Sequence, residues 1–338
     1  MKAIGYRRPL AIENPESLEE LELPAPIAGP RDLLVQVKAI SVNPVDTKVR
    51  KGTAPPAGQA KVLGWDAVGR IEALGSAVTQ FQVGDRVYYA GSLDRAGANS
   101  ELHTVDERIV ALAPQSLSDA DAAALPLTSI TAYELLFDRL GVHPGGGSGQ
   151  ALLIVGGAGG VGSILIQLAR KLTKLQVIAT ASRAETRSWC LELGAHLVID
   201  HSQPLAAELR AAGVPGVEFV AGLTQTPSHF AQILEALKPQ GHLAVIDDMA
   251  GVNTTAMMMK SITLHWELMF TRPLFQTADM GEQGKLLAHV AALVDAGEIR
   301  STATTHLGAL GVKSLREAHQ LLESGKTLGK VVLDGLGR

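Results

Sequence analysis

Hydrophobic and polar positions follow two different patterns along the chain. Up to about residue 125, short apolar runs are separated by Gly, Pro and Asp, which is typical of β-strands; examples are residues 33–42, 67–74 and 85–91. The pair Gly84-Asp85 at the third run indicates a turn between strands. From about residue 127, amphipathic segments alternate with short β-rich runs, which predicts a doubly wound parallel sheet.

The second region allows the elements to be predicted one by one. Helices are expected at residues 129–141, 184–195, 204–213, 227–241, 283–298 and 314–325. Strands are expected at residues 151–155, 175–181, 196–200, 217–223, 242–247, 261–270 and 329–333. The last strand lies well beyond the alternation, so we expect the C-terminus to rejoin the β-rich N-terminal region.

The segment at 152–172, LLIVGGAGGVGSILIQLARKL, has five glycines within seven positions and no charge from Leu152 to Ala169. A membrane span needs about 20 apolar residues, so its length is nearly sufficient. Each glycine would weaken a helix by about 1 kcal/mol relative to alanine, which argues against a span. The apolar run before the glycines and the helical spacing after them instead predict strand, turn, helix and strand.

The turn contains Gly157-x-Gly159-x-x-Gly162, the spacing of a dinucleotide-binding loop. In that motif the first glycine makes the turn, the second lets a pyrophosphate approach and the third lets helix and strand pack closely. The alternative is an ordinary glycine-rich turn. We predict that the loop binds the cofactor, through residues Gly157, Ala158, Gly159, Gly160, Val161 and Gly162.

The residues after the second strand favour NADPH over NADH. An NAD site commonly has an acidic residue there, whereas this chain has Ser182 and Arg183. A hydroxyl and a guanidinium suit a 2′-phosphate. Two alternatives stay open: Ser182 caps the next helix beside a solvated Arg183, or Glu185 binds the ribose.

Composition and charge narrow the class of protein. The 338 residues are 46% apolar and 19% charged, which suits two globular domains. The net charge of −4 argues against nucleic acid as a partner. Because the chain has one cysteine, Cys190, we expect no internal disulfide and no zinc site of several cysteines. Cys190 itself is expected to be packed in a helix. The N-terminus lacks a signal-peptide pattern, and we expect a cytoplasmic protein without membrane contact.

Five segments together resemble the medium-chain dehydrogenase/reductase superfamily, and within it the quinone oxidoreductase branch and the group called zinc-type alcohol dehydrogenase-like proteins. They are residues 41–52, 63–88, 125–136, 156–162 and 329–333. The resemblance covers essentially the whole chain. It implies a GroES-like catalytic domain at 1–126, an NADP-binding Rossmann domain at 127–266, a segment at 267–338 that returns to the catalytic domain, and a homodimer.

The resemblance also allows a test for zinc. Zinc enzymes of the superfamily have a catalytic Cys where this chain has Asn43, and Gly-His-Glu where it has Gly64-Trp65-Asp66. A catalytic zinc needs three protein ligands, and only Asp66 remains. We therefore predict no metal. A metal-free site favours an acceptor that delocalises negative charge, such as a quinone or another conjugated carbonyl.

The same resemblance implies catalytic residues. Asn43 is expected to hydrogen-bond a developing oxyanion at the nicotinamide end of the cleft between the domains, and Asp46 and Thr47 to relay a proton through water. Thr128 corresponds to a position near the nicotinamide; its alternative role is a helix cap. For Asn43, the alternative is a simple turn with Pro44.

Four further residues are predicted at the edges of the site. Lys330 is expected to reach the cofactor, with a solvated lysine as the alternative. Trp65, Phe270 and Phe275 are expected to line the substrate pocket, with the two phenylalanines as core residues in the alternative.

These observations favour an NADPH-dependent quinone oxidoreductase with a small-molecule substrate. An alkenal or enone double-bond reductase, a zinc-dependent alcohol dehydrogenase and a non-catalytic NADPH-binding protein are the alternatives. Three other enzyme signatures are absent from the sequence: Tyr-x-x-x-Lys, Gly-x-Ser-x-Gly and the phosphate loop GxxxxGK[ST].

Overall fold

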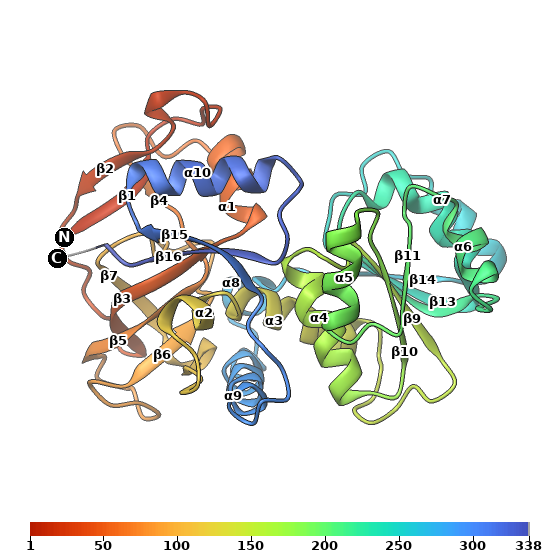
Figure 1. The fold of residues 1–338 in the computed structure, drawn as a ribbon. Helices are drawn as coiled ribbons and strands as arrows, with labels where there is room; N and C mark the ends of the chain where they lie inside the picture. Colours follow the sequence, from red (N-terminus) through yellow and green to blue (C-terminus); the bar gives the residue numbers. More distant parts are fainter. Residues whose placement is uncertain (337–338) are drawn as a thin grey trace. The chain divides into compact units, whose positions relative to one another are not determined.

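The chain divides into two compact units (Figure 1). The computed structural model describes residues 1–336. Unit 1 joins Met1–Ile130 to the segment that begins at Phe270, and unit 2 is Thr131–Met269.

Unit 1 is rich in β-structure, as the short apolar runs predict. A three-stranded sheet has the order β2-β1-β4, and a larger sheet has the order β15-β16-β3-β5-β6-β8, with β7 paired to β3. The strands are β1 (Lys2–Tyr6), β2 (Glu19–Glu22), β3 (Asp32–Val42), β4 (Lys61–Val62), β5 (Ala67–Leu74), β6 (Arg86–Tyr89), β7 (Leu102–Asp106), β8 (Val110–Leu112), β15 (Ala303–Ala309) and β16 (Lys330–Asp334). The Gly84-Asp85 turn precedes β6 as expected, with Gly84 at φ +93°.

The final strand joins the N-terminal part of the chain, which confirms the expected return of the C-terminus. β16 pairs antiparallel with β3, and Val331 lies opposite Val42. Figure 1 shows the two strands side by side although almost 300 residues separate them. The helices of unit 1 are α1 (Pro44–Gly52), α2 (Asp119–Ala123), α8 (Thr271–Phe275), α9 (Glu282–Asp295) and α10 (Val312–Glu323), with 3-10 turns η1 (Pro15–Ser17) and η2 (Glu107–Ile109).

Unit 2 is the predicted doubly wound parallel sheet, with the strand order β11-β10-β9-β12-β13-β14. Its strands are β9 (Ala151–Val155), β10 (Gln176–Thr180), β11 (Leu197–Ile199), β12 (Val217–Gly222), β13 (Leu237–Val245) and β14 (Thr263–Trp266). The order reverses beside β9, which is where such sheets bind ligands at the carboxyl ends of their strands.

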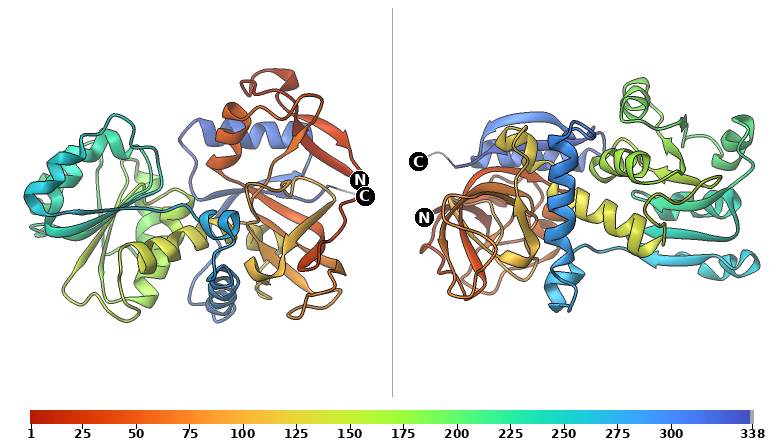
Figure 2. Two further views of the ribbon diagram at one scale, coloured as in Figure 1. Left: turned by 180° about the vertical axis from the view of Figure 1, so that it is seen from behind. Right: turned by 90° about the horizontal axis from the view of Figure 1, so that it is seen from below.

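The helices of unit 2 follow the predicted alternation. They are α4 (Gly160–Leu172), α5 (Ala184–Glu192), α6 (Leu205–Ala211) and α7 (Thr226–Ala236), with η4 (Thr254–Lys260) before β14. α6 and α7 pack against each other; they are labelled in Figure 1, and the left-hand view of Figure 2 shows the same region from behind. A further helix, α3 (Pro126–Tyr133), crosses the boundary between the units and continues as a π-helix, η3 (Glu134–Arg139).

Two predicted boundaries are wrong. The strand expected at 261–270 is only β14, Thr263–Trp266. The helix expected at 227–241 ends at Ala236, and Leu237 already belongs to β13. Pro239 explains the error, because proline disfavours helical geometry in the residue before it and donates no backbone hydrogen bond. Gln240 adopts φ +64°, and the register of β13 against β12 shifts between Val217 and Phe219.

The segment at 152–172 is not one continuous helix, because α4 begins only at Gly160. Within the described residues, no helix has both the length and the apolar character to cross a membrane.

Candidate active site

The glycine-rich loop joins β9 to α4 at the carboxyl end of the parallel sheet. Gly156 turns the chain with φ +92°, a conformation that glycine adopts without strain. Thr180, the last residue of β10, anchors the loop: its hydroxyl accepts a hydrogen bond from Gly156 N at 3.1 Å, and its carbonyl accepts one from Gly157 N at 3.3 Å. The loop is therefore held by its neighbouring strand.

Packing explains two of the three motif glycines and leaves the third unexplained. A Cβ on Gly162 would lie 2.3 Å from Gly156 O, and one on Gly157 would lie 2.7 Å from Ala179 Cβ. The same atom on Gly159 would meet nothing nearer than Gly156 O at 3.6 Å, an ordinary contact. The described residues therefore place no steric demand on Gly159.

The start of α4 provides hydrogen-bond donors next to Gly159. Gly159 is the N-cap of α4, so the first backbone N–H groups of the helix have no partner within it. Such N–H groups and the helix dipole together favour an anion. The open space at Gly159 and the N-terminus of α4 are compatible with a pyrophosphate, and the predicted cofactor contacts of the loop stay a prediction.

The residues after β10 are exposed. Ser182, Arg183 and Glu185 all lie at the surface where α5 begins. The alternative that Ser182 caps this helix is wrong, because Arg183 is the N-cap and no side chain caps it. The predicted contacts with a 2′-phosphate stay a prediction.

Cys190 lies beneath the glycine loop and is fully buried in α5, as predicted. A Cβ on Gly157 would lie 3.2 Å from its sulfur. Burial raises the pKa of the Cys190 thiol to about 12, so the thiol stays protonated and serves as packing.

In unit 1, Asn43 stands at the N-cap of α1, with Pro44 as the first helical residue. The alternative of a simple turn is therefore wrong. The Asn43 side chain is 1% exposed, and its Nδ2 donates to Asp66 Oδ2 at 2.7 Å. The other oxygens near Nδ2, Ser41 O and Trp65 O, are both 3.5 Å away, beyond the usual range for an N–H donor.

Lys330 completes a cluster with Asn43 and Asp66. Its ammonium donates to Asn43 Oδ1 at 2.5 Å, to Val42 O at 3.0 Å and to Asp66 Oδ2 at 3.0 Å. The lysine is 3% exposed, so the alternative of a solvated lysine is wrong. Because its three donors already have acceptors in unit 1, the structure gives no support to the predicted contact with the cofactor.

Asp66 is fully buried and accepts hydrogen bonds on both oxygens. Leu127 N donates to Oδ1 at 2.7 Å, and Oδ2 binds Asn43 and Lys330. Burial raises the pKa of Asp66, while the Lys330 charge and the Asn43 hydrogen bond oppose that rise. The carboxylate thus links the end of the chain to the start of α3.

Asp46 and Thr47 bind the backbone in this structure. Asp46 Oδ2 accepts from Asn43 N at 2.7 Å, and Oδ1 accepts from Gly64 N at 2.9 Å. Burial raises the pKa of Asp46 to about 7, against these hydrogen bonds and the Lys330 charge. The Thr47 hydroxyl donates to Pro44 O at 2.9 Å. These contacts support local structure, and the proton relay stays a prediction.

Thr128 is buried in α3, and its hydroxyl lies 3.3 Å from Ala124 O and 3.2 Å from Leu125 O. It donates to the preceding turn, so the alternative of a helix N-cap is wrong, because a cap accepts a hydrogen bond from a backbone N–H. Its predicted contact with the nicotinamide stays untested.

The three predicted pocket residues have different surroundings. Trp65 is 1% exposed, and its indole N–H donates to Ser92 O at 3.1 Å. Phe270 packs edge-on against Trp65, with 6.2 Å between ring centroids. Phe275 is 76% exposed, so the alternative that it belongs to the core is wrong.

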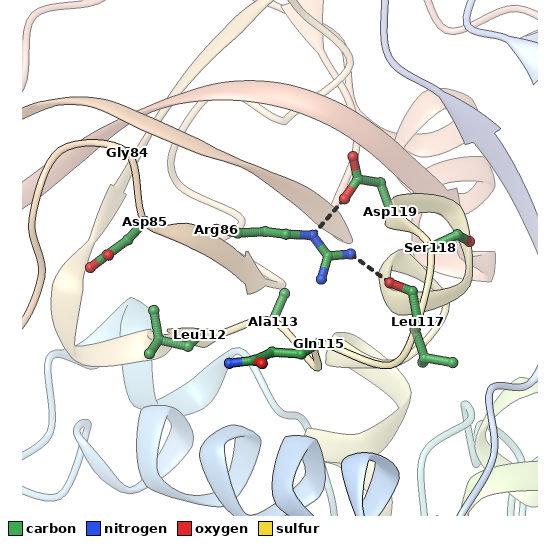
Figure 3. Close-up of a pocket in the computed structure, with 9 residues that line it drawn as sticks. All are labelled: Gly84, Asp85, Arg86, Leu112, Ala113, Gln115, Leu117, Ser118 and Asp119. Atoms are coloured by element: carbon green, nitrogen blue, oxygen red, sulfur yellow. Dashed lines mark hydrogen bonds and ion pairs between the residues drawn. The ribbon is translucent and has the colours of Figure 1, made fainter.

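Two hollows in unit 1 include none of the predicted residues. One, shown in Figure 3, is lined by Gly84, Asp85, Arg86, Leu112, Ala113, Gln115, Leu117, Ser118 and Asp119. Arg86 crosses it and donates to Asp119 Oδ1 at 2.7 Å and to Leu117 O at 3.0 Å. The other lies beside His103, whose ring binds Tyr89 OH at 3.1 Å and Ala96 O at 2.8 Å. Arg86 in the first hollow and His103 in the second are therefore already hydrogen-bonded within the protein.

The residues at the three zinc positions do not fit that metal. The Asn43 amide nitrogen donates to Asp66, and the Trp65 indole nitrogen donates to Ser92 O. Zinc takes nitrogen ligands only through a lone pair, which neither group offers. Within residues 1–336, no group of three or more His, Cys, Asp or Glu side chains is arranged to hold a metal.

Unit 2 contains a second set of buried acids that the sequence analysis did not identify. Glu134 is in the π-helix η3 and Glu267 follows β14; they are 0% and 3% exposed. Arg139 Nε donates to Glu267 Oε2 at 2.8 Å. Burial, followed by the Glu134 charge, raises the pKa of Glu267 to about 9.

Two contacts within the candidate site have no signal in the local sequence. From the sequence, Asp66 is identified only as the one possible ligand remaining at the zinc positions. Its ion pair with Lys330 depends on the pairing of β16 with β3, two segments far apart in the chain. Thr180 lies within the strand predicted at 175–181, but nothing in its spacing indicates that it holds the glycine loop.

Comparison with known proteins places these features in context. Residues 29–115 match the family model "Alcohol dehydrogenase GroES-like domain", and residues 193–333 match "Zinc-binding dehydrogenase". A zinc-type alcohol dehydrogenase-like protein of Staphylococcus epidermidis is 40% identical over 337 residues, 99% of each chain.

Two solved structures are similar along nearly the full length. A putative zinc-dependent alcohol dehydrogenase protein from Rhizobium etli is 51% identical with a TM-score of 0.95, covering 100% of this chain and 99% of that one. The Escherichia coli quinone oxidoreductase complexed with NADPH is 25% identical with a TM-score of 0.83, covering 99% and 100%.

Proposed function

Because the chain belongs to the medium-chain dehydrogenase/reductase superfamily of oxidoreductases, with zinc-type alcohol dehydrogenase-like proteins among its relatives, we propose that it uses NADPH to reduce a quinone or a similar conjugated carbonyl without a catalytic metal. Bound NADPH would supply the hydride, which is the chemistry of the cofactor itself. The residues of this chain bind the cofactor, orient the acceptor and stabilise the charge that develops on it.

The proposal depends above all on the space beside Gly159. The protein has no packing reason for a glycine there, and Gly159 is the N-cap of α4, where the first backbone N–H groups of the helix begin. A pyrophosphate group explains both facts, because it needs close approach to backbone N–H groups. The proposed cofactor contacts are the loop from Gly157 to Gly162.

The exposed residues after β10 support NADPH. Ser182 and Arg183 offer a hydroxyl and a guanidinium, the groups suited to a 2′-phosphate. The similar Escherichia coli structure contains NADPH. Glu185, also exposed, provides the ribose-binding alternative that would favour NADH.

The proposed acceptor follows from the polar groups of unit 1. Without a metal to polarise a carbonyl, the acceptor must itself spread the negative charge that hydride addition creates. Quinones and α,β-unsaturated carbonyls do this. Asn43 is proposed to donate to the acceptor oxygen through the N–H that has no close partner among the described residues.

We also propose a homodimer formed through the edge of the parallel sheet. Within the described residues β14 pairs only with β13. Trp266 at the end of β14 is 56% exposed, and Leu268 just after the strand is 50% exposed. A second copy would cover these side chains. Trp266→Glu should convert the dimer to a monomer in sedimentation analysis; an unchanged dimer would place the interface elsewhere.

The cofactor proposal is tested by calorimetry with NADPH and NADH. Arg183→Glu should weaken NADPH binding on the order of 10–100-fold and change NADH binding little, because only NADPH carries the 2′-phosphate. Lys174→Glu, at an exposed lysine before β10, makes the same charge change as a control and should leave both affinities near wild type. Equal loss of both cofactors in Arg183→Glu would contradict the assignment.

The reaction is tested by NADPH oxidation with a panel of quinones, alkenals and enones. Quinones should be turned over fastest, and a chelator should not reduce the rate. Faster turnover of alkenals would favour the double-bond reductase. Tight NADPH binding with no oxidation by any acceptor would favour a non-catalytic binding protein.

A further inference from the structure

Lys330 is a charged side chain at a position where water cannot solvate it. It begins β16, whose pairing with β3 places it beside Val42 and Asn43. Its side chain is 3% exposed, and its three N–H donors have three oxygen acceptors. A buried ammonium is stable only when it is paired and hydrogen-bonded, and both conditions hold here.

The charge of Lys330 compensates buried carboxylates. Asp66 and Asp46 are both 1% exposed or less, and Lys330 is the cation whose charge acts on both. It contacts Asp66 directly at 3.0 Å, whereas the oxygens of Asp46 bind backbone N–H groups. Without the ammonium, Asp66 would be a buried carboxylate with hydrogen bonds but no countercharge.

The ion pair also determines the orientation of the Asn43 amide. Its oxygen faces the ammonium, and its nitrogen faces the Asp66 carboxylate. A flipped amide would place N–H groups against an ammonium and an oxygen against a carboxylate. The observed orientation leaves the remaining N–H of Nδ2 with only two oxygens at 3.5 Å.

We propose that Lys330 is the cation of this site: a positioning residue that neutralises Asp66 and holds the Asn43 amide with its N–H available to the acceptor. This inference rests on the proposed function for the role of Asn43. It assigns to a side chain of the protein the positive charge that a metal provides in zinc enzymes. It replaces the contact with the cofactor that the sequence predicted for Lys330.

The first test separates charge pairing from general packing. Lys330→Met and Asp66→Asn each leave one buried charge without its partner, and each should lower the melting temperature by about 5 °C or more. The double variant removes both charges and should recover at least half of that loss. Lys313→Met, at an exposed lysine of α10, is the control and should melt like wild type. A double variant less stable than both single variants would overturn the pairing.

If Lys330→Met does not fold, the comparison of Asp66→Asn with the double variant carries the same information. The double variant should then be the more stable of the two, because it no longer contains an uncompensated ammonium. An equal or lower melting temperature would overturn the proposal.

The second test measures positioning with NADPH and 1,4-benzoquinone as the acceptor. In the double variant kcat should fall about tenfold or more, since Asn43 is no longer held, while the Kd for NADPH changes less than about threefold. Recovered stability without recovered turnover identifies positioning. A large rise in the Kd for NADPH with unchanged kcat would instead make Lys330 a cofactor ligand and overturn the proposal.

The stability test and the activity test can be judged independently of each other. If the wild-type protein binds NADPH but oxidises it with no acceptor, the proposed reaction is wrong, and with it the role given to Asn43. The melting temperatures would still decide whether Lys330 and Asp66 form a compensating pair.

Discussion

The glycine loop of unit 2 and the charged cluster of unit 1 are built by opposite means. The loop comes from one continuous segment and offers backbone N–H groups, with side chains kept away. The cluster combines Asn43 at the N-cap of α1, Asp66 just before β5 and Lys330 of the final strand, and the two buried charges are paired with each other. The loop therefore tolerates almost no added atom at two of its glycines, whereas the cluster tolerates almost no change of charge.

This difference predicts which property each region controls. A substitution in the cluster should change stability, and its effect should depend on pH. A substitution in the loop should have no pH dependence, and its effect should depend on whether the added atom points inward or outward.

The largest effect is expected for Asp66→Asn, which leaves the Lys330 ammonium buried without a carboxylate. Breaking a buried pair in this way costs about 3–5 kcal/mol in the free energy of unfolding, measurable by urea denaturation. Glu20→Gln makes the same chemical change at an exposed position on β2 and should alter that energy by about 0.5 kcal/mol at most. Similar values for the two variants would show that burial of the pair does not matter.

Gly162→Ala should have the next largest effect. Its Cβ would lie 2.3 Å from a backbone oxygen, so the turn or the helix must move. Overpacking of this kind costs about 1–3 kcal/mol, and the displaced loop should also bind NADPH poorly. Wild-type stability in denaturation and wild-type affinity in calorimetry would contradict the close packing of α4 on the turn.

The pH dependence of stability should come from the buried acids, not from the loop. Because the pKa of Asp46 is raised to about 7, its contribution is fully present below its unfolded pKa of 3.8 and is lost as the pH rises through about 7. For Glu267, with a pKa near 9, the loss extends from about pH 4.5 to 9. The free energy of unfolding should therefore fall by at most about 1.4 kcal/mol per pH unit for each group.

Two variants separate the pH ranges in which Asp46 and Glu267 titrate. Asp46→Asn should flatten the curve below about pH 7, and Glu267→Gln should flatten it between pH 7 and 9, where Asp46 no longer titrates. Gly159→Ala should leave the curve unchanged. A curve with the wild-type slope in both acid variants would assign the pH dependence to other groups.

The smallest effect on stability is expected for Gly159→Ala. Its backbone, at φ −74° and ψ 177°, suits any residue, and its Cβ meets no close atom. The free energy of unfolding should change by less than about 0.5 kcal/mol, while the affinity for NADPH falls at least about tenfold, because the methyl group blocks the pyrophosphate. Unchanged affinity would remove the main support for the proposed cofactor site.

Features that depend on neighbouring residues could be predicted from the amino-acid order alone. Local spacing was sufficient for the strand, glycine turn and helix at 151–172, for most of the alternating elements of unit 2 and for the absence of the usual zinc ligands. The predicted end of the helix at 227–241 is wrong, because the helical apolar pattern continues past Ala236 into strand β13, which contains Pro239.

The pairing of the buried charges, in contrast, follows from contacts between distant segments of the folded chain. Lys330 joins Asp66 and Asn43 because β16 returns to β3 across almost 300 residues, and no local pattern encodes that contact. The same holds for Glu134 and Glu267, which lie on separate elements of unit 2. A buried charge is stable only beside its partner, and which partner it meets is a property of the folded chain.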